Sequence, residues 1–108
     1  MNKIEKLTAA GFPMAVKHGV VLVDFFAKWH GPCHKQGDLL NALVDSEKFP
    51  EEVKVTQLDV DEAPVIAAKF EVDVIPTLLI FRDGHVAGRI VGAADETQVM
   101  ELFPGKGK

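Results

Sequence analysis

Four runs rich in apolar and β-branched residues predict strands. The longest, Val20–Phe26, shows no alternation of apolar and polar residues, which is typical of a strand buried on both faces. Val53–Val60 alternates and predicts a second strand. Thr77–Arg82 leads into Asp83-Gly84, a strong short-range hairpin signal, so we expect His85–Val91 to be its antiparallel partner.

Helical patterns lie around these strands. Thr8 can cap a helix over about 9–17, and Pro32 is well placed as the first residue of a helix that reaches about Ser46. A third helix is expected to start near Pro64, and a fourth to run from about 95 to 103. Their predicted buried residues are Leu39, Leu40, Leu43 and Val44, then Val65, Ile66 and Phe70, and finally Val99, Met100, Leu102 and Phe103. Strands that alternate with helices and end in a hairpin predict a three-layer α/β/α domain with a central mixed sheet.

Length and composition fit a single domain over residues 1–108, with a frayed tail at about 104–108. The balance of 47% hydrophobic and 26% charged residues is typical of a globular protein, and a net charge of −4 argues against a nucleic-acid partner. The N-terminus does not resemble a secretory signal, and no apolar run is long enough to span a bilayer. We therefore expect no membrane partner and a cytoplasmic location.

The chain has one cysteine, Cys33. One thiol excludes an internal disulfide and any multi-cysteine metal site within a single copy, so thiol chemistry would need a second molecule. The sequence has no glycine-rich phosphate loop, Ser–His–Asp set or HExxH pattern, and we expect no cofactor.

Four short motifs occur in a fixed order: Val23-Asp24-Phe25, Trp29-His30-Gly31-Pro32-Cys33, Ile75-Pro76-Thr77 and Val91-Gly92-Ala93. Together they resemble the thioredoxin family, whose pattern is Val-Asp-Phe, Trp-Cys-Gly-Pro-Cys, Ile-Pro-Thr and Val-Gly-Ala. The likeness runs from about residue 3 to 103. It implies a thioredoxin-like fold and a protein or peptide partner that carries a thiol or disulfide.

The sequence departs from the family at the reactive centre. His30 stands where the family has its exposed nucleophilic cysteine, and only the resolving cysteine remains, as Cys33. Reduction of a disulfide by a dithiol needs one thiolate to attack and a second thiol to resolve the mixed disulfide. The chain is therefore not expected to be a self-sufficient disulfide reductase, and any oxidoreductase activity would follow a monothiol route.

Two interpretations of Cys33 stay open. The helix N-terminus and a protonated His30 would stabilise its thiolate, whereas burial would destabilise it. Cys33 is then either a reactive thiol polarised by His30 or an inert small hydrophobe. With an inert Cys33, the chain would be a non-catalytic binding module.

Asp24 lies within an apolar run, where an unpaired carboxylate is costly and favours its neutral form. The resemblance implies a buried acid that exchanges protons with the resolving thiol. The family's companion lysine is missing, because Gln57 occupies that position. The proton-transfer equipment is then either retuned or unused.

A metal site is a further alternative. His30, Cys33 and His34 have the spacing i, i+3 and i+4, which places three borderline-to-soft ligands on one helix face.

The resemblance also implies a groove for extended protein segments. It implies a cis peptide bond at Pro76 that exposes the backbone of Ile75, an apolar lid at Trp29, and a close approach at Gly92. The groove's other expected residues are Gly31 and Pro32. The polar stretch 35–38 departs from the family, and we expect it to be diverged surface beside the motif.

Overall fold

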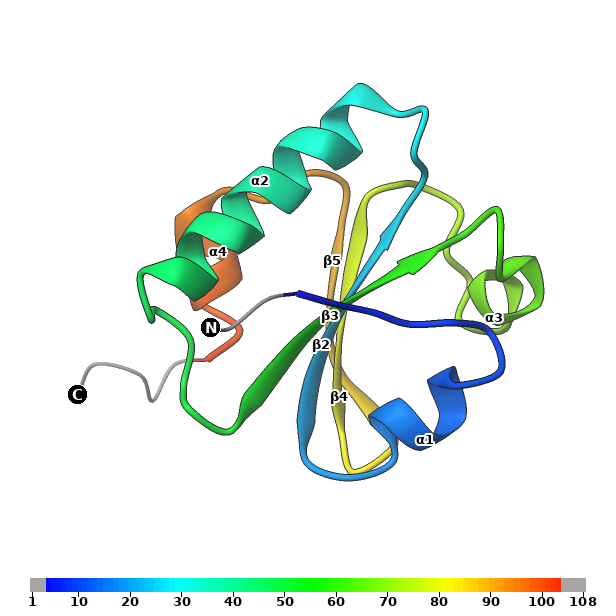
Figure 1. The fold of residues 1–108 in the computed structure, drawn as a ribbon, viewed down its shortest axis with the longest axis horizontal. Helices are drawn as coiled ribbons and strands as arrows, with labels where there is room; N and C mark the ends of the chain where they lie inside the picture. The colour runs from blue at the N-terminus through cyan, green and yellow to red at the C-terminus, as the bar shows by residue number, and fades with distance from the viewer. Residues whose placement is uncertain (1–3, 104–108) are drawn as a thin grey trace.

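A central sheet with helices on both faces makes up residues 4–103, the part of the chain that the computed structural model describes (Figure 1). The expected frayed tail at 104–108 lies outside these residues. In chain order the elements are β1 (Glu5–Lys6), α1 (Phe12–Val16), β2 (Val20–Phe26), α2 (Gly31–Asp45), β3 (Val53–Asp59), α3 (Pro64–Lys69), β4 (Thr77–Arg82), β5 (His85–Val91) and α4 (Glu96–Met100).

The five strands lie in the order β1-β3-β2-β4-β5. β3 pairs in parallel with β1 and β2, whereas β4 is antiparallel to both β2 and β5. The sheet is therefore mixed, as the sequence predicts. β2 lies at its centre, which explains why Val20–Phe26 is apolar on both faces.

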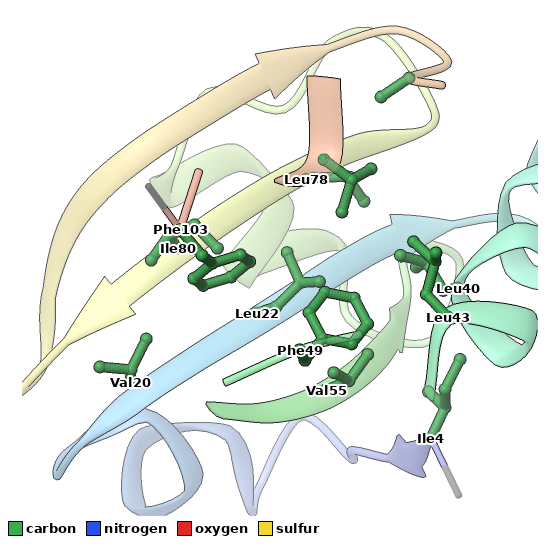
Figure 2. Close-up of a cluster of buried hydrophobic side chains, with 12 residues drawn as sticks. Ile4, Val20, Leu22, Leu40, Leu43, Phe49, Val55, Leu78, Ile80 and Phe103 are labelled. Carbon is green, nitrogen blue, oxygen red and sulfur yellow. The ribbon is translucent and has the colours of Figure 1, made fainter. Parts of the chain in front are cut away.

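Each face of the sheet has its own core. α2 and α4 cover one face, and α1 and α3 cover the other (Figure 1). Successive strand residues point to opposite faces, so Leu22 enters the first core and Val23 the second. The first core is shown in Figure 2 and consists of Ile4, Val20, Leu22, Leu40, Leu43, Phe49, Val55, Leu78, Ile80, Ala94, Val99 and Phe103.

The same alternation places Asp24. It has the parity of Val20 and Leu22, so its side chain belongs to the face that α2 covers. Asp24 pairs in register with Gln57 of β3. The topology thus brings an acid, an amide and the N-terminal half of α2 together inside the protein.

The predicted hairpin is present between β4 and β5. Asp83 and Gly84 both adopt positive φ, at 51° and 87°, the conformation that a tight two-residue turn requires. The Asp83 carboxylate also accepts a hydrogen bond of 2.8 Å from the backbone N–H of Gly19. This contact ties the turn to the start of β2.

Some predicted boundaries are wrong. α1 starts at Phe12 rather than near residue 9, because Thr8 accepts a hydrogen bond from the N–H of Gly11 and holds the preceding residues in a turn. Val65 is 79% exposed, since the short α3 buries only its other side through Ala67. Met100 and Leu102 are half-buried, and α2 starts at Gly31, one residue before Pro32.

Candidate functional site

The motif from Trp29 to Cys33 spans the turn between β2 and α2. His30 is the N-cap residue of α2, and its carbonyl accepts hydrogen bonds from the N–H groups of Cys33 (3.1 Å) and His34 (3.3 Å). Gly31 and Pro32 form the exposed first positions of the helix. Cys33 points inward and is only 2% exposed.

His30 and Cys33 are in contact. Nδ1 of the imidazole lies 3.2 Å from the Cys33 sulfur, within hydrogen-bonding distance. The rings of Trp29 and His30 meet edge to face at 5.4 Å between centroids, and the Trp29 indole N–H donates to Asp61 at 2.9 Å. A continuous series of contacts therefore runs from Asp61 through Trp29 and His30 to the sulfur.

Burial decides the ionisation of the thiol. It raises the pKa of Cys33, and the nearby Asp24 carboxylate raises it further, while a hydrogen bond with the backbone of Ala27 acts in the opposite direction. Burial is the largest of these influences on the pKa of Cys33. At neutral pH Cys33 is a protonated thiol with an imidazole nitrogen beside it.

Asp24 is fully buried, at 0% exposure. Gln57 Nε2 donates to one of its carboxylate oxygens at 3.1 Å, whereas the other oxygen, Oδ1, has no hydrogen-bond partner among residues 4–103. Burial raises the pKa of Asp24 from 3.8 to about 6, against a lowering by the Gln57 hydrogen bond. Asp24 therefore changes charge near neutral pH.

The three residues of the metal alternative do not converge. His34 is exposed, and its Nε2 contacts the carbonyl of Lys28 rather than turning towards Cys33. Among residues 4–103 no group of three or more His, Cys, Asp or Glu side chains is arranged to hold a metal ion. The geometry thus gives His34 no role as a third ligand to His30 and Cys33.

The Ile75–Pro76 peptide bond, which belongs to the expected groove, is cis. Pro76 is buried, Ile75 is half-buried, and the carbonyl of Pro76 accepts a hydrogen bond of 2.9 Å from the N–H of Gly92. Gly92 has a φ of +88°, which favours glycine. Gly31 and Pro32 line a groove of about 550 Å³ together with Ala93 and Ala94.

Three exposed apolar side chains belong to the sequence motifs or directly adjoin them. Trp29 is 71% exposed, Val74 48% and Val91 57%. Val91 pairs with Thr77, directly after Pro76, and the Thr77 hydroxyl donates to the carbonyl of Val74. The sequence does not predict the exposure of Val74 and Val91, because an apolar pattern does not distinguish a buried valine from an exposed one.

The expectation that the stretch 35–38 is surface is wrong for two of its residues, although Lys35 and Asp38 are exposed. Gln36 and Gly37 are both buried. The Gln36 amide pairs with the backbone of Ala94, and Gly37 faces Gln57. Their spacing of i+3 and i+4 from Cys33 was the signal available, since it places them on the inward face of α2 with Leu40.

A second cavity, of about 390 Å³, lies on the other side of α2. Cys33, Gly37 and Gln57 are among the residues that line it, together with Asp59 and Lys28. Asp59 is buried and lies 3.8 Å from Lys28 Nζ. No helix within residues 4–103 is long and apolar enough to cross a membrane.

Comparisons with known proteins agree with this geometry. The thioredoxin family model matches residues 3–103. A thioredoxin of Staphylococcus aureus is 40% identical over 100 residues, which cover 93% of this chain and 94% of that protein. The oxidised form of mitochondrial thioredoxin 3 from Saccharomyces cerevisiae superposes with a TM-score of 0.78 at 33% identity, covering 92% of each chain.

A further similar structure comes from work on the thiol resolving mechanism of yeast mitochondrial 1-Cys peroxiredoxin via glutathione and thioredoxin systems. It has a TM-score of 0.79 at 31% identity and covers 93% of each chain. The matches extend over nearly all of the sequence and include the mixed sheet that carries the site. This chain therefore belongs to the thioredoxin family.

Proposed function

We propose that this protein is a monothiol member of its family, which binds an extended protein segment beside Pro76 and exchanges Cys33 with the thiol or disulfide of that partner. The observation that carries the proposal is the 3.2 Å contact between His30 Nδ1 and the Cys33 sulfur. The imidazole occupies the position of the missing nucleophile and supplies a proton acceptor instead of a second sulfur. The chain can therefore form one mixed disulfide but cannot resolve it alone.

The proposed exchange requires a disulfide on the partner, which supplies two sulfur atoms. Cys33 loses its proton and attacks one sulfur of a partner disulfide, so the Cys33–partner bond forms as the partner's S–S bond breaks. The other partner sulfur leaves as a thiolate and takes up a proton. An external thiol then attacks the mixed disulfide, forms a new disulfide with the partner sulfur and returns Cys33 as a thiol.

His30 and Asp24 have different roles in this proposal. His30 touches the sulfur and accepts its proton during attack, which is needed because burial keeps the thiol protonated. Asp24 is a buried reservoir for a proton, supported by its raised pKa of about 6 and its electrostatic influence on Cys33. Neither role requires a metal or cofactor.

The groove supplies the partner site. Trp29, Val74 and Val91 offer exposed apolar surface, and the cis bond before Pro76 supports strand-like pairing with an extended segment. Binding would cover the exposed side of the motif and hold a partner sulfur close to a thiol that diffusing reagents reach poorly. A reducing compartment such as the cytoplasm would provide the external thiol.

A non-catalytic binding module is the second candidate. The burial of Cys33, at 2% exposure, favours it, since a thiol that no partner sulfur can reach serves only as core. The two candidates share the groove and differ only in whether the sulfur reacts. Substitution of Cys33 by serine separates them, because pure binding should survive it.

Mixed-disulfide formation under native conditions tests the proposal directly. The protein is incubated at pH 8 with an extended peptide that carries an activated disulfide, and intact-mass spectrometry follows the adduct. We expect one adduct per chain, absent in Cys33→Ser and released by dithiothreitol. An adduct that forms only in denaturant would remove the thiol role and leave the binding module.

The role of His30 has its own matched comparison. His30→Phe keeps a ring of similar size without a nitrogen, and we expect the adduct to form about 100-fold more slowly, the usual contribution of a positioned base. His18→Ala, an exposed histidine in the turn before β2, is the control and should react at the wild-type rate. Equal rates for all three proteins would show that the imidazole does not assist.

A further inference from the structure

We propose that Gly37 is a positioning residue, which holds the amide of Gln57 against Asp24 by leaving out a side chain at its own position. This inference rests on the proton role proposed for Asp24, and it concerns how the carboxyl is kept ready. It also explains two departures from the family pattern as one pair.

Gly37 lies inside a 15-residue helix, where glycine is unfavourable. A glycine in a helix interior costs about 1 kcal/mol relative to alanine, and Gly37 is neither at a cap nor at a positive φ. The reason lies across the interface with β3. A Cβ at position 37 would lie 3.3 Å from Gln57 Nε2, closer than such atoms normally approach.

A shift of the Gln57 amide would disturb its hydrogen bond to Asp24. Its Nε2 donates to Asp24 Oδ2 at 3.1 Å, whereas the other carboxylate oxygen, Oδ1, has no hydrogen-bond partner among the described residues. A push of a few tenths of an ångström on Nε2 weakens that bond. A buried carboxylate is strongly disfavoured once its donor is lost.

Gly37 and Gln57 also border a cavity beside α2. This cavity, of about 390 Å³, also reaches Cys33. A side chain at position 37 would therefore act at the point where the amide meets both the carboxyl and the cavity. The consequence is that Gly37 sets how readily Asp24 ionises, although it does not touch Asp24.

The ionisation of Asp24 can be followed without any thiol chemistry, by titrating its side-chain carbon with NMR. We expect Gly37→Ala to make ionisation about tenfold less favourable, as expected when a hydrogen bond to a charged group is weakened. Gln57→Ala should have a similar effect. In the Gln57→Ala background, Gly37→Ala should change nothing, because the amide it displaces is already absent.

The wild type, the two single variants and the double variant form a double-mutant cycle. The other charged or titratable groups around the cavity are the same in all four proteins, so the cycle isolates the contact between position 37 and Gln57. Besides Cys33 they are Lys6, Lys28, His34, Asp38, Asp59 and Glu62. Asn41→Ala is the matched control, because Asn41 lines the same cavity one turn further along α2, and it should leave the titration of Asp24 unchanged.

Two results would overturn the inference. One is an unchanged titration of Asp24 in Gly37→Ala, and the other is an equal shift with and without Gln57. If Gly37→Ala alone does not fold, the double variant decides: it should fold and titrate like Gln57→Ala, and its failure to fold would overturn the inference as well. An unreactive Cys33 would instead contradict the proposed function and leave this result standing.

Discussion

The Gln36 side chain pairs with both backbone polar groups of Ala94. Its Nε2 donates to the Ala94 carbonyl at 3.2 Å, and its Oε1 accepts from the Ala94 N–H at 2.7 Å. Gln36 is 2% exposed and Ala94 is 7% exposed. One buried amide thus joins the helix that carries Cys33 to the segment that follows Gly92, so the two sides of the site are held in one relative position.

Gln36→Leu should destabilise the protein by about 2–3 kcal/mol. Leucine has a similar size, but it leaves the N–H and C=O of Ala94 buried without partners, and each such group costs about 1–3 kcal/mol. Urea unfolding followed by far-ultraviolet circular dichroism measures the free energy. Lys35→Ala, its exposed neighbour, should stay within about 0.5 kcal/mol of wild type. Equal stabilities for Gln36→Leu and wild type would mean that the Ala94 pairing has no net value.

Asp24→Asn should stabilise the protein at pH 7.5 and have little effect near pH 4. Since the folded pKa is raised from 3.8 to about 6, the native state binds the proton more tightly than the unfolded chain. The protonated Asp24 carboxyl therefore adds about 3 kcal/mol to the free energy of unfolding. This contribution is complete below pH 3.8 and is lost as pH rises through 6. The neutral amide does not titrate and therefore avoids this loss.

The measurement is the free energy of unfolding of both proteins at pH 4, 5, 6 and 7.5. Other carboxyl groups cancel in the difference, which should grow over this range in favour of the variant. A difference that is constant with pH would contradict the raised pKa of Asp24.

Much of the fold could be predicted from local patterns. Val20–Phe26 has a composition that suits only a central strand, and Asp83-Gly84 specifies a turn by itself. β1 was missed because its two residues, Glu5 and Lys6, are exposed and carry no apolar pattern. Thr8 was expected to cap a helix, but its hydroxyl stabilises a turn instead, and the choice depends on residues that follow it.

The site was predictable as a set of motifs and less so as a set of contacts. The order of the motifs gave His30, Cys33 and Pro76. The inward direction of Gln36 and Gly37 depends on which face of α2 meets the sheet, a tertiary property that polar residue types hide. The burial of Cys33, which raises the pKa of its thiol, also needed the structure, because a sequence does not show how deeply a residue lies.

Asp61→Ala should free the Trp29 indole with little loss of stability. The Trp29 N–H donates to Asp61 at 2.9 Å on the surface, where such a bond contributes at most about 1 kcal/mol. Trp29 is the only tryptophan of the chain, so the tryptophan fluorescence comes from this residue alone. We expect lower fluorescence anisotropy in the variant, with Glu51→Ala as an exposed acidic control. Unchanged anisotropy would show that Asp61 does not hold the ring.

Val91→Asp should weaken capture of a disulfide-bearing extended peptide, by about tenfold or more in apparent affinity. It places a charge on the apolar surface beside Pro76, and a charge that a partner buries without pairing is costly. Val86→Asp is the matched control, because Val86 is 42% exposed on the same strand but at the hairpin end. Peptide titrations followed by Trp29 fluorescence compare the two. Equal losses of affinity in both variants would show that the peptide does not bind at the surface beside Pro76.

His30→Cys should convert the protein into a disulfide reductase that turns over with dithiothreitol, whereas the wild-type chain should not turn over. The substitution returns a second sulfur to the N-cap position, whose side chain already reaches Cys33, so a mixed disulfide can be resolved within one molecule. His34→Cys also adds one sulfur, but at an exposed position turned towards Lys28, and it should remain inactive. Turnover by the wild-type monomer would contradict the monothiol mechanism. A folded but inactive His30→Cys would show that the missing sulfur is not the only cause of inactivity. Gln57 would then be the next residue to test, because it also departs from the family pattern and its side chain contacts Asp24.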